Sequence, residues 1–248
     1  MQRRLLVQML VIAVIASAIG IAVALSINWF PVAAATRAKP VDDLYDVLLI
    51  VSVPIFVLVE VVVLFSVWKF RMRPGEEEKD GPPIHGNTVL EIIWTAVPAL
   101  LIFGLVAYAY TVLRDIEAKK PNTMTVNVTG QQFFWTFQYQ RPDGKRVSSS
   151  QLYLPKGRPV EFRVHSTDVI HSFFVPAFRS KIDAVPGITT TIRVTPSRIG
   201  AYQVVCAELC GLGHSTMRAP VRVVAPAQFT TWLERQSTAP APGAAATG

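Results

Sequence analysis

The 248-residue sequence contains few cysteines and histidines: only Cys206 and Cys210, and four histidines. No cysteine lies directly after the first apolar run, which excludes a lipoprotein anchor at that point. No internal repeat is visible, which argues against a repeat architecture. Acidic residues are also scarce, with 17 Asp and Glu against 24 Lys and Arg. Residues 115–235 hold 15 basic and 8 acidic residues, so this segment alone carries a net charge of +7.

Apolar residues, in contrast, make up 51% of the chain, and the mean hydropathy is +0.37. Three apolar runs are long enough to cross a hydrocarbon core of about 30 Å at about 1.5 Å per residue; they cover residues 5–27, 47–68 and 92–113. Pro54 and Pro98 lie inside the second and third runs, where neighbouring helices in a bundle tolerate proline. The sequence therefore predicts membrane-spanning segments attached to a globular part.

The first run permits two interpretations. The basic start "MQRR", the apolar stretch and the small residues of "VAAAT" are typical of a signal peptide. Its 23 uncharged residues, however, exceed the usual signal core of about 7–15 residues. Residues 1–28 are predicted to be a transmembrane helix or a signal peptide, and the length favours the helix.

Basic flanks predict the orientation in the membrane. "MQRR" and "KFRMR" (residues 69–73) are the kind of segment that stays in the cytoplasm. Residues 44–114 then form a transmembrane helical hairpin, and everything after residue 113 lies on the extracytoplasmic side of the cell membrane. This placement of the last domain holds whether or not the first run is cleaved.

From residue 123 the sequence changes to short β-prone runs separated by turn residues. Val160, Phe162 and Val164 alternate with charged or polar neighbours. Residues 115–226 are therefore predicted to form a small antiparallel β-sandwich or barrel. Residues 227–248 are predicted to be a short helix followed by a disordered Ala/Pro/Gly tail. The basic charge of this external part favours a protein partner or anionic lipid and argues against nucleic acid.

The stretch "CAELCGLGHSTM" (residues 206–217) concentrates soft metal ligands. Thiolate, imidazole and thioether together suit copper and not magnesium or calcium. Cys210, His214 and Met217 follow the order of a mononuclear blue-copper site, and Cys206 adds a second thiolate. Two thiolates can bridge two copper ions, so the pattern predicts a dinuclear site. Two cysteines in an external domain more commonly form a disulfide, but the glycines, histidine and methionine that follow favour copper.

The dinuclear interpretation requires one more imidazole and one more weak donor. His85 belongs to the cytoplasmic loop, which leaves His165 and His171. His171, in "DVIHSFFVP", precedes an apolar strand and is better placed than His165, which alternates with outward-facing residues. The weak donor could be a backbone carbonyl of the loop between the cysteines, which contains Glu208.

Four ordered motifs resemble cytochrome c oxidase subunit II. "CAELCGLGHSTM" resembles the CuA motif of that family, and "DVIHSFFVPAFRSKIDAVPG" resembles its first-histidine segment. "GQQFFWTFQY" is similar to its aromatic stretch, and "NTVLEIIWTAVPALL" to the start of its second core transmembrane helix. The resemblance implies an α+β membrane protein, in which a helical hairpin precedes an all-β cupredoxin-like barrel.

The resemblance also implies a set of cofactors and ligands. Dinuclear CuA would be bound by His171, Cys206, Glu208 through its carbonyl, Cys210, His214 and Met217. The Glu208 carboxylate would reach a magnesium or manganese ion shared with the catalytic subunit. Haem would be held only by that partner, subunit I, because no histidine of this chain lies in an apolar run.

The aromatic stretch departs from the family pattern at Phe133, where the family usually has tryptophan. The resemblance associates this region, Phe133, Phe134 and Trp135, with electron uptake from cytochrome c; packing in the core or at an interface is the alternative. A phenyl ring lacks the size and N–H of an indole. The basic external domain also favours a cytochrome that is acidic, tethered or bound within a complex.

Two carboxylates fall in or beside the apolar runs, where a charge is costly and suggests a function. Glu91 matches the glutamate that the family places at the mouth of a proton-uptake path, and the alternative is an ordinary interfacial acid. Glu60 lies about 12 Å from the cytoplasmic end of its helix and is interpreted as a polar contact with a partner subunit.

The expected function is the electron-accepting subunit of a proton-pumping cytochrome c oxidase, an oxidoreductase whose oxygen reduction occurs in another subunit. Further oxidase subunits, cytochrome c and membrane lipid are the expected partners. The alternatives are a CuA subunit of a nitric oxide reductase, a quinol oxidase subunit, which usually lacks the copper ligands, and a membrane-tethered copper-binding protein without an oxidase partner.

Overall fold

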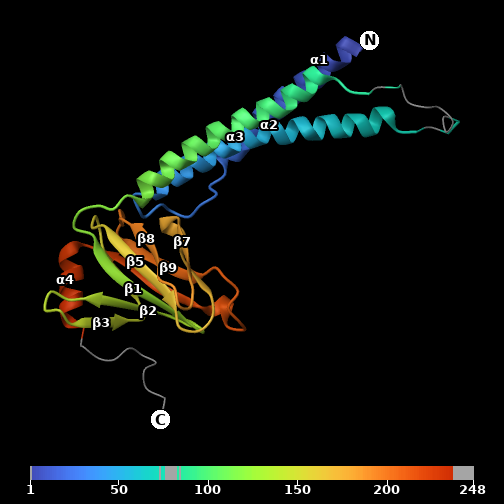
Figure 1. Cartoon of the computed structure of the whole chain (residues 1–248). Helices are drawn as coiled ribbons and strands as arrows, with labels where there is room; N and C mark the ends of the chain where they lie inside the picture. Colours follow the sequence, from blue (N-terminus) through green and yellow to red (C-terminus); the bar gives the residue numbers. More distant parts are fainter. Residues whose placement is uncertain (1, 73, 76–82, 84, 237–248) are drawn as a thin grey trace. The chain divides into compact units, whose positions relative to one another are not determined.

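The computed structural model describes residues 2–72, 74–75, 83 and 85–236, and these form two compact units (Figure 1). Met1–Trp29 and Asp43–Thr111 make the first unit, and Phe30–Asp42 and Val112–Gly248 make the second. The predicted Ala/Pro/Gly tail after residue 236 lies outside the described residues.

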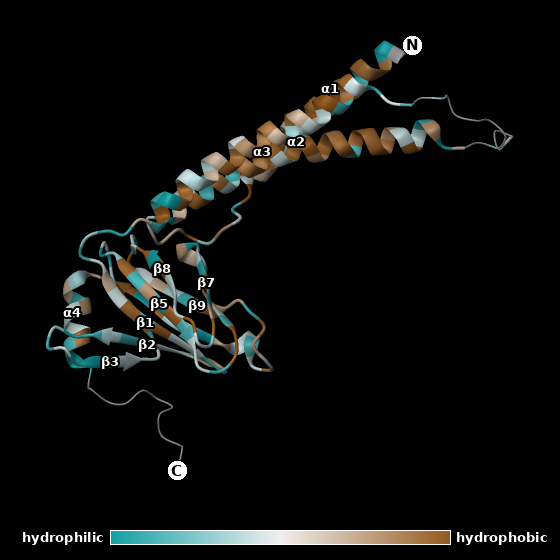
Figure 2. Ribbon diagram, in the orientation of Figure 1, coloured by the Kyte–Doolittle hydropathy of each residue, from teal (hydrophilic) through white to brown (hydrophobic). Residues whose placement is uncertain are grey.

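Three long helices form the first unit and extend at two ends into the second: α1 (Gln2–Ser26), α2 (Ala38–Phe70) and α3 (Thr88–Glu117). All three are long and apolar enough to cross a membrane, and Figure 2 shows that most of their residues are hydrophobic. Pro54 and Pro98 are accommodated inside α2 and α3. Helices α1 and α2 approach closely at Gly20, where a Cβ atom would lie 2.8 Å from Cγ1 of Val53. The helices extend beyond the predicted apolar runs because polar residues continue the helical turns at their ends.

The described residues of the second unit form ten strands and a C-terminal helix α4 (Pro226–Arg235). In chain order they are β1 (Met124–Gln131), β2 (Phe134–Gln140), β3 (Arg146–Ser149), β4 (Leu152–Pro155), β5 (Val160–Ser166), β6 (His171–Val175), β7 (Ser180–Ala184), β8 (Thr190–Val194), β9 (Gly200–Cys206) and β10 (Arg218–Val224). They make two five-stranded sheets with the orders β3-β2-β1-β5-β8 and β4-β10-β9-β6-β7. This is a two-sheet β-sandwich.

The sheets are mixed, so the prediction of a purely antiparallel arrangement is wrong for two strand pairs. Strand β1 runs parallel to β5, and β4 runs parallel to β10. The other pairs are antiparallel. The physical reason is that the chain changes sheets between β3 and β4 and again between β4 and β5, so these strands pair with distant partners. Single-strand patterns do not carry that information.

Alternating apolar side chains of both sheets fill the space between them. Val126 and Val128 of β1 face inward, as do Phe162 and Val164 of β5, and all four are fully buried. Phe173 of β6 comes from the opposite sheet and contacts the Phe162 ring at a centroid distance of 5.3 Å. The predicted alternation in β5 is thus present. Fully burying such side chains stabilises the fold by about 1.5–3 kcal/mol each.

The linker before α2 belongs to the β unit. Ala34 and Ala35 are buried, and the Ala34 N–H donates to the carbonyl of Ala177 over 2.8 Å. The Arg179 guanidinium donates to both oxygens of Asp42, at 2.7 and 3.0 Å, and to the carbonyl of Pro31 at 2.8 Å. Residues 30–42 are therefore part of the folded domain, which the sequence pattern did not indicate.

Candidate metal centre

Two neighbouring strands bring together a histidine and a cysteine. His171 is the first residue of β6, and Cys206 is the last residue of β9. The two strands run antiparallel with Phe173 opposite Cys206, so His171 lies two residues from the position facing Cys206. Both side chains are buried. Their strand positions give them a rigid backbone.

The loop after β9 supplies the remaining donors. Cys210 is buried in this loop, His214 starts the short 3-10 helix η2 (His214–Thr216), and Met217 follows it directly. The N–H of Cys206 donates to the carbonyl of Met217 over 3.1 Å. This hydrogen bond closes the loop at its base and holds its first and last donors side by side.

Two sulfur atoms form the middle of the cluster, and each faces a different imidazole. The Sγ atoms of Cys206 and Cys210 are 3.8 Å apart. Nδ1 of His171 lies 3.9 Å from the Cys206 sulfur, and Nδ1 of His214 lies 3.7 Å from the Cys210 sulfur. The ligand atoms of His171 and the two cysteines lie within 4.8 Å of one another. The arrangement resembles two adjoining ligand sets that share a pair of sulfurs.

Each sulfur also has one weaker donor beside it. Sδ of Met217 lies 3.8 Å from the Cys210 sulfur, and the carbonyl oxygen of Glu208 lies 3.3 Å from the Cys206 sulfur. Met217 is fully buried, whereas the Glu208 side chain is exposed. The structure thus brings all six predicted copper donors into one cluster, and the Glu208 carboxylate stays available outside it.

The chemistry of this donor set fits copper. Both cysteines are free thiols, and their sulfur separation is far longer than the bond of about 2.05 Å in a disulfide. Burial, together with the neighbouring Cys206, raises the pKa of the Cys210 thiol to about 11. Two thiols, two imidazoles and a thioether are soft or borderline donors, which suit copper. Because thiolates are the ligating form, binding a cation here would release protons.

Asp168 fixes the ring of His171. The Nε2 atom of His171 lies 2.8 Å from Oδ1 of Asp168. The carboxylate also accepts from the N–H groups of Gln132 and Val169, at 2.7 Å each. Burial alone would raise the pKa of Asp168, but these hydrogen bonds outweigh it and hold the pKa below its usual value. With Nε2 as donor, Nδ1 is left to face the sulfurs.

Phe133 covers the ligand loop. A Cβ atom at Gly213 would lie 2.5 Å from the Phe133 ring carbons, so the ring lies directly against the loop backbone. The side chain of Gln132 donates to the carbonyl of Cys210 over 2.5 Å. The connection between β1 and β2 therefore supports the loop from one side.

Gly130 and Trp135 enclose the other imidazole. A Cβ atom at Gly130 would lie 3.1 Å from the ring of His171 and from the ring of Trp135. The indole of Trp135 meets the His171 ring edge-on, with a centroid distance of 6.0 Å, and is buried. Glycine at this position lets the imidazole lie close to strand β1.

Known proteins resemble this chain along most of its length. Family models match twice: "Cytochrome C oxidase subunit II, transmembrane domain" over residues 22–112, and "Cytochrome C oxidase subunit II, periplasmic domain" over residues 145–224. Cytochrome c oxidase subunit 2 of Thermostichus vulcanus is 33% identical, over 86% of this chain and 80% of that protein. The chain belongs to the cytochrome c oxidase subunit II family.

Another relative and one solved structure are also similar to this chain. Cytochrome c oxidase subunit 2 of Synechocystis sp. is 29% identical, over 92% of this chain and 84% of that protein. The crystal structure of the periplasmic domain of subunit II of cytochrome oxidase from Bradyrhizobium japonicum is 28% identical and covers 48% of this chain and 96% of that one, with a TM-score of 0.45. As in other subunit II proteins, transmembrane helices precede a cupredoxin-like β domain that belongs to the extracytoplasmic side.

The three aromatic residues predicted for electron uptake in this subunit II differ in exposure. Trp135 lies in the core behind His171, with 1% of its surface exposed. Phe133 is half-buried against the ligand loop, and Phe134 is 37% exposed. Only Phe134 offers a substantial surface to a partner, whereas Phe133 packs on the ligand loop and Trp135 packs against His171 in the core.

Glu91 and Glu60 lie in the helical unit. Glu91 is in the first turn of α3, where its Oε1 accepts from the N–H of Asn87 over 3.3 Å. Oδ1 of Asn87 in turn accepts from the N–H of Leu90 over 3.1 Å. Glu91 therefore also caps a helix, a role that sequence analysis missed. Glu60 is exposed on α2, and its predicted contact with a partner subunit stays a prediction.

The other two histidines have different surroundings. Nε2 of His165 is 3.3 Å from Oγ1 of Thr129, and His85 is exposed in the segment before α3. Sequence reasoning missed two residues that support the cluster, Asp168 and Gln132. The position of Asp168 three residues before His171 is the signal that could have indicated the first of them.

Proposed function

We propose that this chain is the electron-accepting subunit of a haem–copper cytochrome c oxidase, with dinuclear CuA bound at the cluster described above. The observation that carries this proposal is the pair of sulfurs 3.8 Å apart, each facing its own imidazole. A single-copper site needs one thiolate and two imidazoles. A second thiolate and a second weak donor are expected only where two metal ions share the sulfurs.

The six donors would hold the metal pair in a fixed frame. His171 and His214 each provide one imidazole, Cys206 and Cys210 provide the shared sulfurs, and Met217 and the Glu208 carbonyl provide the weak donors. When bound, dinuclear copper supplies a carrier for one electron at a time. The cytochrome would deliver that electron and haem in the catalytic subunit would receive it, so that oxygen is reduced to water in another chain.

The surrounding residues would keep the donors from moving when the charge changes. His171 is tied to a strand and to Asp168, so its ring has little freedom to rotate. Met217 and Cys206 are joined through the backbone at the base of the loop. Burial of His171, Cys210 and Met217 excludes water from that side of the cluster. Rigidly held metal ligands and the exclusion of water favour fast electron transfer.

Two further metal assignments follow the family. The exposed carboxylate of Glu208 is free to bind a magnesium or manganese ion shared with the catalytic subunit, while its carbonyl faces the Cys206 sulfur. Haem is assigned to the partner because, of the four histidines in the chain, none lies in α1, α2 or α3. Glu91, at the cytoplasmic end of α3, is assigned to proton uptake by the oxidase.

Metal content and oxygen consumption of the purified oxidase test this function. We expect two copper ions per chain at this site, a mixed-valence electron paramagnetic resonance signal, and oxygen uptake with cytochrome c as the electron source. His214→Ala should remove the signal and the turnover. His165 lies outside the cluster, so the control variant His165→Gln should retain both. One copper ion per chain, or none, would refute the proposal.

A nitric oxide reductase with the same subunit is the second candidate, because the donor cluster would be the same and the catalytic metals belong to another chain. Oxygen uptake distinguishes the two, since such a reductase would consume nitric oxide instead. A membrane-tethered copper carrier would contain labile copper and work without a haem partner. Stable copper that is reduced by cytochrome c within the complex would exclude the carrier.

A further inference from the structure

A hollow on the β unit lies beside the places where the chain enters and leaves the membrane helices. Its volume is about 290 Å³. Its lining comes from the linker before α2, the end of α3 with the following segment, and strands β5 and β8: Thr36, Arg37, Pro40, Asp115, Ile116, Ala118, Lys120, Thr123, Pro159, Val160, Arg193, Val194 and Thr195. None of these residues belongs to the metal cluster.

The sequence places this hollow at the level of the lipid head groups. Pro40 lies seven residues before the apolar run 47–68, and Asp115 lies two residues after the run 92–113. Along a helix these separations correspond to about 10 Å and about 3 Å. The head-group layer extends on the order of 5–8 Å beyond the hydrocarbon on each side. Both flanks of the hollow therefore fall in or next to that layer, on the extracytoplasmic side.

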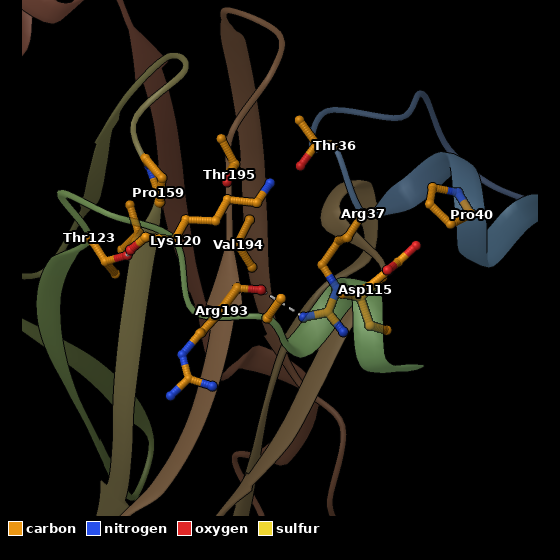
Figure 3. Close-up of a pocket in the computed structure, with 13 residues that line it drawn as sticks. Thr36, Arg37, Pro40, Asp115, Lys120, Thr123, Pro159, Arg193, Val194 and Thr195 are labelled. Atoms are coloured by element: carbon orange, nitrogen blue, oxygen red, sulfur yellow. Dashed lines mark hydrogen bonds between the residues drawn. The ribbon is translucent and has the colours of Figure 1, made fainter. Parts of the chain in front are cut away.

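Two cationic side chains project into the hollow from opposite walls, Lys120 from one and Arg37 from the other (Figure 3). Nη1 of Arg37 donates to the carbonyl of Arg193 over 2.8 Å, and its buried Nε has no acceptor. Lys120 is exposed and has no acidic partner among the described residues. The hollow thus offers positive charge that the protein itself does not fully neutralise.

The other charged groups around the hollow are accounted for. Arg193 is paired with Glu161 at 2.9 Å and donates to the carbonyl of Glu117. Burial lowers the pKa of Arg37, and the nearby Glu117 charge partly offsets this effect. Asp115 is the one acidic side chain among the described lining residues. An anionic ligand would therefore be bound by Lys120 and Arg37 and opposed by Asp115.

We propose that this hollow binds the phosphate of an anionic phospholipid. The cations Lys120 and Arg37 would contact the phosphate, and the hydroxyl groups of Thr36, Thr123 and Thr195 lie in the same lining as further donors. Apolar side chains such as Ile116 and Val194 line the remainder, which suits the glycerol and the first methylene groups. A free phosphate ion would use the cations but not this apolar wall.

The surface next to the hollow supports the same ligand class. A second, more open hollow shares Thr123 and Pro159 with the first and is also lined by Lys156 and Arg158. Both of these cations are exposed. Basic residues beside a membrane attract anionic lipid. The cations of the two hollows therefore account for part of the positive net charge of the domain.

Lipid binding by the full chain in a non-ionic detergent tests this proposal. Short-chain phosphatidylglycerol, short-chain phosphatidylcholine and inorganic phosphate would each be titrated, with native mass spectrometry as the readout. Lys120→Gln should weaken binding of phosphatidylglycerol about fivefold, the usual effect of one juxtamembrane cation. Lys119→Gln removes the same charge from the adjacent exposed residue, which does not line the hollow, and should leave the affinity unchanged.

A substitution of opposite effect provides a second test. Asp115→Asn removes the acidic lining residue and should strengthen phosphatidylglycerol binding about fivefold. Unchanged copper content in all three variants would show that the fold is intact. Equal losses in the Lys119 and Lys120 variants would indicate diffuse attraction and overturn the proposal. It would also be overturned if inorganic phosphate or phosphatidylcholine bound as tightly as phosphatidylglycerol.

Discussion

Nε2 of His171 lies 2.8 Å from Oδ1 of Asp168, and the backbone N–H groups of Gln132 and Val169 hold the same carboxylate. The carboxylate therefore has a fixed position and, in turn, fixes the imidazole. Because the hydrogen bond occupies Nε2, Nδ1 is directed at the Cys206 sulfur 3.9 Å away. The orientation of a donor is thus determined by a residue that does not touch the sulfurs.

Asp168→Asn should weaken copper retention. The amide keeps the shape of the side chain but removes the negative charge that makes the imidazole a stronger donor, and such changes typically cost about 10–100-fold in metal affinity. Competition with a copper chelator measures the effect. Asp143→Asn, in the turn between β2 and β3, is the control and should retain copper like the parent protein; equal retention in both variants would contradict the role of Asp168.

Phe133 and Phe134 should have separable effects. Phe133 lies against Gly213 of the ligand loop, so Phe133→Ala should change the visible and paramagnetic spectra of the bound copper. Phe134 is exposed, so Phe134→Ala should leave the spectra intact and raise the KM for cytochrome c. Steady-state kinetics together with spectra of both variants check this. An altered spectrum in Phe134→Ala would show that the two residues are not separated in this way.

Turnover of the oxidase should require the ionisable carboxyl group of Glu91 and not only its hydrogen bond at the start of α3. Glu91→Gln keeps an oxygen that can accept from Asn87 but cannot release a proton at neutral pH, so turnover should fall about as far as in Glu91→Ala, with copper unaffected. Asn87→Ala removes the cap while retaining the carboxylate and should preserve most of the turnover. If Glu91→Gln respires normally while Glu91→Ala does not, the residue serves only as a cap.

The linker 30–42 should be required for a stable β domain. A fragment 115–235 lacks the partner of Arg179, whose side chain is only 6% exposed and is paired with Asp42. Because Asp42 is 28% exposed, loss of this charged hydrogen-bonded pair should cost about 1.5–3 kcal/mol. In the full chain, Arg179→Met should lower the unfolding temperature of the β domain, measured by circular dichroism, whereas Arg198→Met at an exposed site should not. Equal unfolding temperatures would show that the linker is dispensable.

Glu161 should make stability depend on pH. Burial alone would raise its pKa, but hydrogen bonds and charges from Arg193 and Arg163 outweigh this and hold the pKa below its usual value. Because the folded-state pKa is the lower one, the stabilisation is complete above the ordinary carboxyl pKa of about 4.3 and is lost as pH falls through the folded value.

Glu161→Gln should therefore destabilise the β domain by about 2 kcal/mol at pH 7. The difference from the parent protein should shrink as the pH falls below the ordinary carboxyl pKa of about 4.3 and through the lower folded-state pKa of Glu161. Thermal unfolding of the full chain, at pH 7 and at a pH below the folded-state pKa of Glu161, measures this change. A difference that stays constant between the two pH values would exclude an ionic contribution from Glu161.

The sequence predicted the elements that local patterns encode. Long apolar runs predicted the three long helices, because a membrane span needs little more than length and hydrophobicity. Alternation in β5 predicted the inward positions of Phe162 and Val164. The donors after Cys206 were recognisable because one loop carries them at short, regular spacing.

Features that depend on pairing between distant segments were not predictable in this way. The parallel partners of β1 and β10 follow from changes of sheet along the chain. The incorporation of Ala34 into the β domain depends on contacts with Ala177, more than 140 residues later in the chain. The burial of Trp135 behind His171 likewise arises from packing between the two sheets.

The hydrogen bond from the Cys206 N–H to the Met217 carbonyl closes the ligand loop at its base. Residues 206–217 carry five of the six donors, and His171 alone comes from another part of the chain. This loop could therefore be transferred to another protein as a single segment. A related two-sheet domain with a histidine at the start of the strand next to the loop would need only this one segment exchanged to acquire the full donor set.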